Sequence, residues 1–278
     1  MEEDGLYRPE IKAHSLEKIR RHNYYAALFS KAMHKRWANR AYIGLYAGAG
    51  RALVQPGDEL VETSALAVFR QEVPFTKYIF VDSDPRCIDA LRARIQALPS
   101  SFDVTLITRD VNSSVPEIIT AMPRYNAARG EGVISLCFVD PFRVDLNFDV
   151  IRQLSRYKID FLVMLPLGYD LRRNFQRYLD DENDTRVGSW IDAPDWREQW
   201  RTSMQPDRKI VRFILEKFDE AMERLGFHRR EMEDTVSVKV TGMGVYLYSL
   251  ALYTRHELGK QFWKDTKART QPYYDMGL

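Results

Sequence analysis

The chain has only two cysteines and five histidines among its 278 residues. Cys87 and Cys137 stand far apart and provide neither a disulfide framework nor a zinc site, and the histidines show no ligand spacing. No apolar run is long enough to cross a membrane. The first residues, Met1 to Asp4, are acidic where a secretory signal would be basic and then apolar. We therefore expect a cytoplasmic protein with reduced thiols, no bound metal and no membrane partner.

A strong net charge is also lacking, because 41 basic residues face 39 acidic ones and leave a net charge of +2. The charge of the whole chain therefore does not point to nucleic acid. Basic residues do gather locally, in a first helical stretch, at Arg172-Arg173 and near the end of the chain. They suit either solvated helix faces or phosphate contacts. We hypothesise that Arg172 and Arg173 bind a negatively charged substrate, which makes nucleic acid a possible partner.

Short apolar runs alternate with amphipathic stretches from residue 41 onward. The pattern predicts strands at 41–46, 78–81, 104–107, 133–139 and 161–165. It predicts helices at 63–71, 85–98, 115–122, 148–157 and 171–179. Such alternation, with β-rich apolar runs, is typical of a parallel sheet that is covered by helices on both faces.

The two ends of the chain add further elements. Residues 1–40 are interpreted as an N-terminal helical segment, with a basic helix at about 15–38, and residues 41–278 as one domain. Two late strands are joined by a connection too short for a parallel crossover, so they form an antiparallel pair. A helix at 210–225 precedes them and a basic helix at 256–269 follows. The complete prediction is an α/β fold with a mostly parallel seven-stranded sheet that ends in this pair.

Residues 180–207 are polar and are predicted to form an irregular insertion. Three tryptophans lie within it: Trp190, Trp196 and Trp200. We interpret them as local core, in preference to a platform that stacks on bases.

Acidic residues stand at the ends of three predicted strands. "IFVDSDP" places Asp82, "LITRDV" places Asp110 and "LCFVDPF" places Asp140 at the carboxyl edge of the sheet, where open α/β sheets bind ligands. Asp82 could accept hydrogen bonds from both hydroxyls of a ribose, and Asp110 from an adenine amino group. The first strand ends in "YAGAG", whose glycines Gly48 and Gly50 permit a tight turn and a close approach to a ligand. Each acid alone suits a solvated strand end or a helix cap, but together they favour a ligand site.

The glycine turn, Asp82, Asp110, Asp140-Pro141-Phe142 and the terminal antiparallel pair occur in an order that resembles class I S-adenosylmethionine-dependent methyltransferases. That resemblance implies a Rossmann-like fold. More narrowly, "YIGLYAGAGR", "FVDPF" and "VYLYSLALYTRHELGKQFW" are similar to the three-Cys-motif partner (TcmP) family. The similarity covers most of the chain and is weakest in the 180–207 insertion.

The resemblance implies S-adenosylmethionine as the cofactor. It assigns cofactor binding to Ala47, Gly48, Gly50, Asp82, Ser83, Asp110 and Val111. Asp140, Pro141 and Phe142 resemble the DPPY-type element of amino-methyltransferases, in which an acidic or carbonyl oxygen accepts from the target amino group and an aromatic ring stacks on a planar substrate. The chain differs from the families at Gly44, where an acid is common, and at Phe142-Arg143, which replace the second proline and the tyrosine.

Methyl transfer to an amino group, on a nucleobase or a protein side chain, is the activity that the resemblance implies. The alternative is a non-catalytic, cofactor-binding partner of a protein with a three-cysteine motif, which the two cysteines of this chain cannot supply. A third class, the nucleotide-binding proteins with a GxxxxGK[ST] loop, is disfavoured because the motif is missing.

Overall fold

The computed structural model describes residues 3–126, 128, 131–203, 209–231, 234–239 and 246–270. The strands are β1 (Glu10–Lys12), β2 (Asn39–Leu45), β3 (Arg51–Gln55), β4 (Glu59–Glu62), β5 (Lys77–Asp82), β6 (Val104–Thr108), β7 (Val133–Val139), β8 (Ile159–Leu165), β9 (Val236–Lys239) and β10 (Tyr246–Tyr253). The α-helices are α1 (His14–Met33), α2 (Ser64–Ala67), α3 (Pro85–Gln96), α4 (Val115–Ala121), α5 (Phe148–Leu154), α6 (Arg173–Asp180), α7 (Arg186–Trp190), α8 (Trp196–Thr202), α9 (Ile210–Arg224) and α10 (Glu257–Arg269). Short 3₁₀-helices η1 (Val68–Arg70) and η2 (Val111–Ser113) and a π-helix, η4 (Leu167–Arg172), complete the description.

One large sheet organises the molecule, with the strand order β6-β5-β2-β7-β8-β10-β9. Ranked along the chain, these strands follow the order 3-2-1-4-5-7-6. β5, β6, β7 and β8 pair in parallel around β2, whereas β10 runs antiparallel to both β8 and β9. The predicted seven-stranded sheet and its antiparallel pair are confirmed. Strand order reverses at β2, between β5 and β7, which is the place where such sheets bind ligands.

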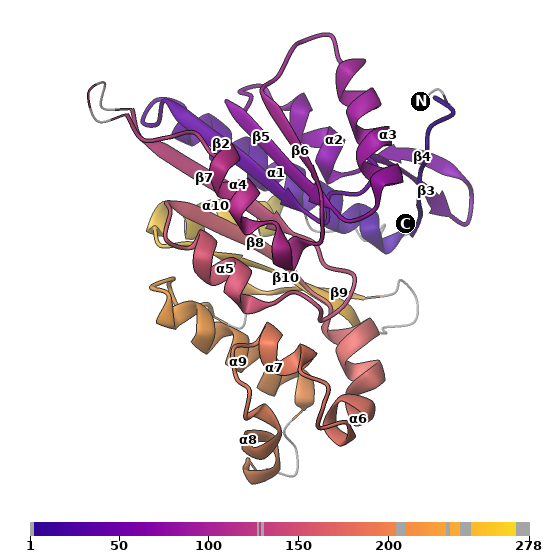
Figure 1. Ribbon diagram of the computed structural model, residues 1–278, viewed down its shortest axis with the longest axis vertical. Coiled ribbons are helices and arrows are strands. Elements are labelled where there is room, and N and C mark those ends of the chain that lie inside the picture. Colours follow the sequence, from indigo (N-terminus) through magenta and orange to yellow (C-terminus); the bar gives the residue numbers. More distant parts are fainter. Residues whose placement is uncertain are drawn as a thin grey trace, which may run out of the picture.

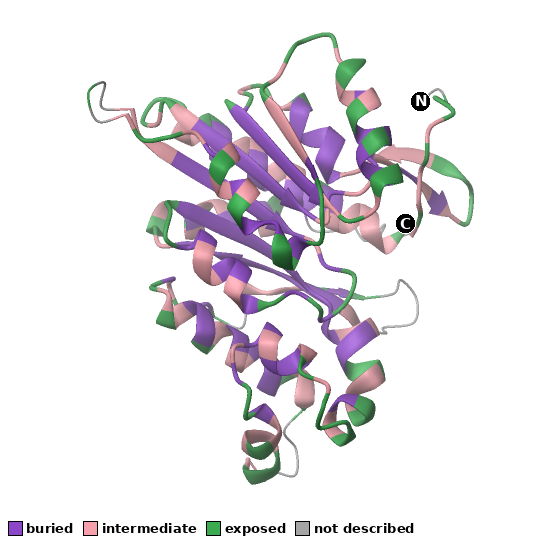
Figure 2. Cartoon of the chain, in the orientation of Figure 1, coloured by how far each residue is buried: buried purple, intermediate pink, exposed green. Residues whose placement is uncertain are grey.

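Helices cover both faces of this sheet (Figure 1). Successive residues of a buried strand point to opposite faces, so each strand contributes side chains to two cores. On β2, Ile43 and Leu45 belong to a core that includes residues of α4, α5, α7 and α9. Tyr42 points the other way, into a core with residues of α1, α2, α3 and α10. Figure 2 shows the resulting buried sheet between two half-buried helical layers. α1 contacts β7 and α10 and so belongs to the same body as the rest of the domain.

Three predictions of local structure are wrong. The 180–207 segment is not irregular, because α7 and α8 lie within it; its last residues, 204–207, lie outside the described residues. The helix predicted at about 15–38 ends at Met33, and the one predicted at 171–179 is a π-helix up to Arg172 before α6 begins. A second sheet, β1-β3-β4, is not predicted at all.

Two of the three tryptophans of the insertion are buried and the third, Trp200, is partly buried against the same core, as interpreted from the sequence. Trp190 and Trp196 are both 0% exposed. Trp190 contacts Phe218 of α9, with ring centroids 5.4 Å apart, and Trp200 contacts Phe213 at 5.3 Å. They fix α7 and α8 onto α9. Among the described residues, no helix combines the length and the apolar character needed to cross a membrane.

Candidate functional site

The chain turns sharply after β2, and this turn forms one wall of the candidate site. Tyr46, Gly48 and Gly50 all have positive φ angles, of 61°, 66° and 83°. At Gly48 an added Cβ would meet nothing within 4 Å, so the backbone faces open space. At Gly50 it would lie 2.8 Å from Leu91 Cδ1. Gly48 therefore leaves room for a ligand, whereas Gly50 lets α3 pack closely behind the turn.

Asp82, at the end of β5, fixes the glycine turn in place. Its Oδ2 accepts a hydrogen bond from the Gly48 backbone N–H at 2.8 Å, and its Oδ1 accepts from the Asp84 N–H at 2.9 Å. A carboxylate offers about four acceptor positions, so two remain for a ligand. Asp84 in turn caps α3 by accepting from the Arg86 N–H, and Ser83 between the two acids is exposed. Ala47 is largely buried, and its N–H bonds to the carbonyl oxygen of Val81 at 3.0 Å.

Asp110, at the end of β6, is exposed and caps η2 by accepting from the Asn112 N–H at 2.9 Å. Val111 is 2% exposed and packs into the core, so it could offer a ligand only its backbone. The Asn112 side chain donates to the carbonyl oxygen of Asp145 at 2.9 Å and accepts from the Asn147 N–H at 2.7 Å. This bridge ties the loop after β6 to the loop after β7.

Asp140, at the end of β7, is held by a lysine that sequence reasoning missed. Lys18 Nζ lies 2.6 Å from Asp140 Oδ1, and each of the two side chains is 16% exposed. The ammonium group also lies 5.9 Å from the centroid of the Tyr248 ring. Helical spacing is the sequence feature that could have drawn attention to Lys18. It precedes the fully buried His22 by one helical turn, on the side of α1 that packs against β7.

The two residues after Asp140 differ sharply in exposure. Pro141 is buried, whereas Phe142 is 78% exposed. The Tyr169 hydroxyl points to the carbonyl oxygen of Pro141 at 3.4 Å, and its ring meets that of Phe142 at 6.2 Å in an edge-on arrangement. Burial raises the pKa of Tyr169 well above its ordinary range, so this hydroxyl stays a neutral donor.

Asp170, in η4, holds the loop after β7 against α6. It is 4% exposed. Its Oδ2 accepts from the Val144 N–H at 2.8 Å, and its Oδ1 accepts from the Tyr178 hydroxyl at 3.0 Å and from the Asn174 amide at 2.8 Å. η4 itself lies tightly against β10, since a Cβ at Gly168 would be 2.6 Å from the carbonyl oxygen of Leu247.

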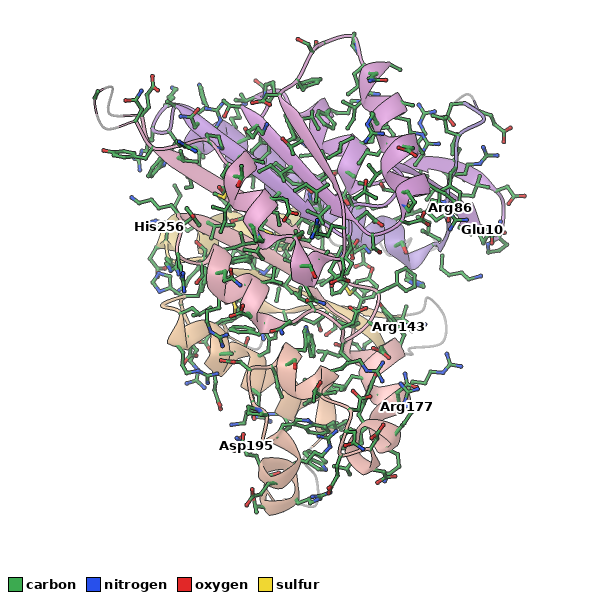
Figure 3. The ribbon with its side chains drawn as sticks, viewed as in Figure 1. Glu10, Arg86, Arg143, Arg177, Asp195 and His256 are labelled. Atoms are coloured by element: carbon green, nitrogen blue, oxygen red, sulfur yellow. The ribbon has the colours of Figure 1, made fainter. Side chains whose placement is uncertain are left out.

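A cleft of about 370 Å³ opens beside Phe142, and we call it the arginine cleft. Its lining consists of Phe142, Arg143, Tyr169, Asp170, Arg173, Asn174, Arg177, Tyr178 and Arg186. Figure 3 shows Arg143 and Arg177 on the same side of the molecule. Of the two arginines predicted to bind substrate, the structure brings Arg173 into this lining, while the exposed Arg172 is not part of it.

Gly44 of β2 lies where neighbouring rings leave no room for a side chain. A Cβ there would lie 2.9 Å from Cδ1 of Phe80 and 3.3 Å from Cε1 of Tyr42. The aromatic rings on this face of the sheet leave no space for an acidic side chain at this position. β2 therefore adds no carboxylate to those of Asp82 and Asp110.

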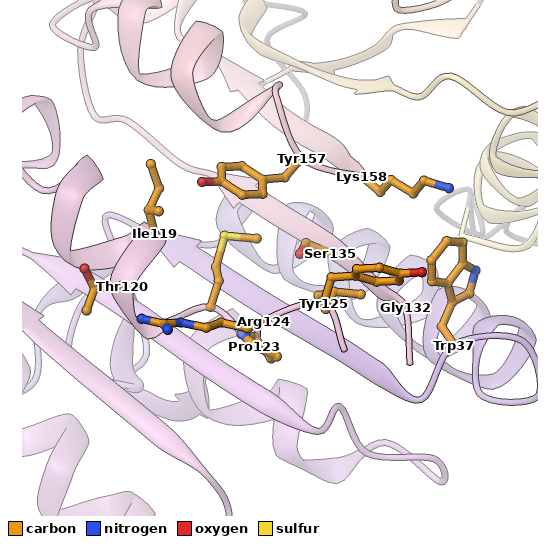
Figure 4. A pocket seen from close by; sticks show the side chains of 12 residues that line it. Trp37, Ile119, Thr120, Pro123, Arg124, Tyr125, Gly132, Ser135, Tyr157 and Lys158 are labelled. Carbon is orange, nitrogen blue, oxygen red and sulfur yellow. The ribbon is translucent and has the colours of Figure 1, made fainter. Parts of the chain in front are cut away.

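A second cavity, of about 540 Å³, lies at the opposite edge of the sheet (Figure 4). It is lined by residues at the amino ends of β7 and β8, among them Val133, Ser135 and Lys158. Asp140 follows the carboxyl end of β7, so this cavity is separate from the candidate site. Within the described ranges, no group of three or more His, Cys, Asp or Glu side chains could hold a metal ion.

No protein-family model matches the chain, and no curated protein matches its sequence. Among solved structures, the chain is similar to protein LPL1258 from Legionella pneumophila str. Philadelphia 1, of the family model DUF519. The TM-score is 0.51, with 10% sequence identity over 93% of this chain and 92% of that chain.

Two methyltransferases also align, each with a TM-score of 0.42. The O-methyltransferase from Bacillus cereus in complex with SAH is 10% identical, over 86% of this chain and 90% of that one. Magnesium protoporphyrin IX methyltransferase from Synechocystis PCC 6803 with bound SAM is 8% identical, over 87% and 82%. At 10% sequence identity, the similarity to LPL1258 shows a shared α/β fold.

Proposed function

We propose that this chain is an S-adenosylmethionine-dependent methyltransferase that acts on an amino group of a nucleobase or of a protein side chain. The main support is that Gly48, Asp82, Asp110 and Asp140 lie at one edge of a sheet ordered 3-2-1-4-5-7-6. Open α/β sheets bind their ligands at this edge, beside the strand where the order reverses.

The residues at this edge fit an adenosine-containing cofactor. The open space at Gly48 admits a ligand close to the backbone. Asp82 is fixed by two backbone N–H groups and keeps two acceptor positions for the ribose hydroxyls. The exposed Asp110 carboxylate suits the adenine amino group. Further contacts are proposed from Ala47, Ser83 and the backbone of Val111, with Gly50 supporting the turn from behind.

The Asp140-Pro141-Phe142 element would receive the amino group of the substrate. When bound, the cofactor supplies a methyl group that is already activated as a sulfonium, so the protein mainly has to position the acceptor. Lys18 holds Oδ1 of Asp140, which leaves Oδ2 to accept an N–H hydrogen bond and to aim the nitrogen lone pair. The carbonyl oxygen of Pro141 offers a second acceptor, and the exposed ring of Phe142 a stacking surface. Asp140 is also placed to take up the proton that the methylated nitrogen loses.

The resemblance to the TcmP family supports a second candidate function. In it, the chain keeps the fold and the cofactor but acts as the non-catalytic partner of a protein with a three-cysteine motif. Both cysteines of this chain are free and buried, at 8% exposure for Cys87 and 0% for Cys137. A three-cysteine motif would therefore have to come from the other protein.

Transfer of a radiolabelled methyl group from S-adenosylmethionine to cell-extract RNA, DNA and protein separates the two functions. We expect the wild type to label one fraction. Asp140→Asn should reduce labelling by about two orders of magnitude, the usual contribution of a positioned proton acceptor, while cofactor affinity changes little. Asp89→Asn, a change to an exposed acid of α3 that pairs with Arg92, is the matched control.

Unchanged labelling by Asp140→Asn would remove Asp140 from the chemistry. If the wild type binds the cofactor but labels no fraction, even when the three-cysteine-motif protein is added, the partner function is favoured over the enzyme.

A further inference from the structure

The arginine cleft contains more positive charge than its surroundings neutralise. Arg143, Arg173 and Arg177 are exposed, and no carboxylate of the described residues forms an ion pair with any of them. Asp170 is the acid in the lining. Its oxygens already accept from Val144, Asn174 and Tyr178. Arg177 lies over the Tyr178 ring, 5.2 Å from its centroid, and hydrogen-bonds to that side chain, but this neutral partner leaves its charge in place. The three guanidinium groups are therefore available to attract an anionic ligand.

Other arginines of the chain do have acidic partners. Arg186, in the same lining, pairs with Asp184 through two nitrogens. On α5 and α9, outside the cleft, Arg152 pairs with Asp149 and Asp192, and Arg224 also pairs with Asp192. Arg172, an exposed neighbour outside the lining, forms no ion pair with a described residue either. The cleft is therefore distinguished by having three such arginines on one concave surface.

The positions of the three arginines are fixed by the fold. Arg143 belongs to the loop after β7, which Asp170 holds through the Val144 N–H. Arg173 and Arg177 are one turn apart on α6, so they lie on the same face of that helix. Asp170 also accepts from Tyr178 of α6, so a single buried carboxylate sets the loop and the helix relative to each other. The cleft is therefore formed before a ligand arrives.

An exposed aromatic ring lines the arginine cleft and is close in sequence to the proposed reaction centre. Phe142 is 78% exposed, and its ring meets Tyr169 edge-on, which leaves a face free. It follows Asp140 by two residues. A ring in this position can stack on a planar base whose amino group reaches Asp140, while the phosphates that flank this nucleotide reach the arginines.

We propose that the arginine cleft binds phosphodiester groups of a single-stranded nucleic acid, and that Phe142 stacks on the base that is methylated. This inference rests on the proposed function and selects nucleobases over protein side chains as the target. A single strand is favoured because an amino group inside a duplex is paired and stacked and must be extruded to be reached. The chain has a net charge of only +2, which suits a few local phosphate contacts better than a broad duplex-binding face.

Binding of fluorescently labelled twelve-nucleotide single strands, one of RNA and one of DNA, to the full chain tests the proposal through its dependence on salt. Three phosphate contacts predict that log affinity falls with log salt at a slope of about 2, since each contact on a single strand contributes about 0.7. The double variant Arg173→Gln with Arg177→Gln should lower the slope by about 1.4. Arg172→Gln is the matched control, because Arg172 is an exposed neighbour that does not line the cleft; it should leave the slope unchanged.

Phe142→Ala should weaken binding by about fivefold to 150-fold, the range for loss of one stacked base, without altering the salt slope. The proposal is overturned if neither oligonucleotide binds in a salt-dependent way, or if Arg172→Gln lowers the slope as much as the double variant does. It is also overturned if a mononucleotide or inorganic phosphate competes with the strand at equal concentration of phosphate groups, since the cleft would then be a site for free phosphate. Cofactor binding, measured separately by calorimetry, distinguishes the failures: oligonucleotide binding without cofactor binding refutes the methyltransferase, and the reverse refutes only the nucleic acid substrate.

Discussion

The ion pair between Lys18 and Asp140 is expected to be energetically coupled far more strongly than an ordinary surface pair. The two charged atoms lie 2.6 Å apart and each side chain is 16% exposed. Exposed pairs contribute about 0.2–1 kcal/mol, and breaking a fully buried pair costs about 3–5 kcal/mol. For a pair that is largely buried, we expect a coupling energy of about 1.5–3 kcal/mol, which is the range for hydrogen bonds to charged groups.

A double-mutant cycle on the free energy of unfolding measures this coupling. Lys18→Met removes the charge and keeps much of the stem, and Asp140→Asn keeps the shape of the carboxylate. Urea denaturation of the wild type, both single variants and the double variant gives the coupling energy. A second cycle on Lys31 and Glu72 is the matched control, since this pair also starts from α1 but its side chains are 62% and 77% exposed; it should yield less than about 1 kcal/mol. Equal coupling in the two cycles would refute the reasoning that α1 secures the candidate catalytic carboxylate.

Two further predictions concern the stability of the fold. Burial lowers the pKa of His22 to about 4 from an ordinary 6.5, so the native state binds fewer protons than the unfolded state between these values. Its contribution of about 3 kcal/mol is complete above pH 6.5 and is lost as the pH falls toward 4. Unfolding free energies at pH 7.5, 6 and 5 should therefore decline less for His22→Gln than for the wild type, and an identical decline would contradict the assignment. Asp160, whose pKa burial raises to about 7, acts in the opposite direction in both proteins and cancels in the comparison. Gly168→Ala should destabilise the protein by about 1–3 kcal/mol, because the added Cβ would overlap the Tyr246 carbonyl oxygen and lie 2.6 Å from that of Leu247; thermal unfolding at the wild-type temperature would show that this contact is tolerated.

The central part of the fold could be predicted because its strands are nearly continuous apolar runs. β7 and β8 are buried along almost their whole lengths, and such runs separated by amphipathic helices leave few alternatives to a parallel sheet. α7 and α8 could not be found in this way, since they have five and seven residues and their composition is polar. β3, the central strand of the small sheet, shows alternating burial over only five residues, which is too short for a distinct periodic signal.

The candidate site, like the fold, is predictable from the sequence only in part. Acids at strand ends are predictable because parallel strands bring their carboxyl ends to one edge. Helical spacing places Lys18 on the packed side of α1, but its contact with Asp140 is not predictable from local sequence, because the two residues are 122 positions apart. The choice between Arg172 and Arg173 depends on the rotation of about 100° between successive helical residues, and the switch from π-helix to α-helix at Arg173 changes that phase.

Calorimetric titration of the full chain with S-adenosylhomocysteine tests the central claim most directly, because it requires neither the substrate nor a partner. The account predicts one binding site per chain, with affinity lowered by Asp82→Ala by about 1.5–3 kcal/mol through loss of the acceptor for the ribose hydroxyls. Asp89→Asn, on the exposed side of α3, should bind like the wild type. A wild-type protein that is folded but releases no binding heat at any temperature tested would contradict the assignment of this sheet edge to the cofactor.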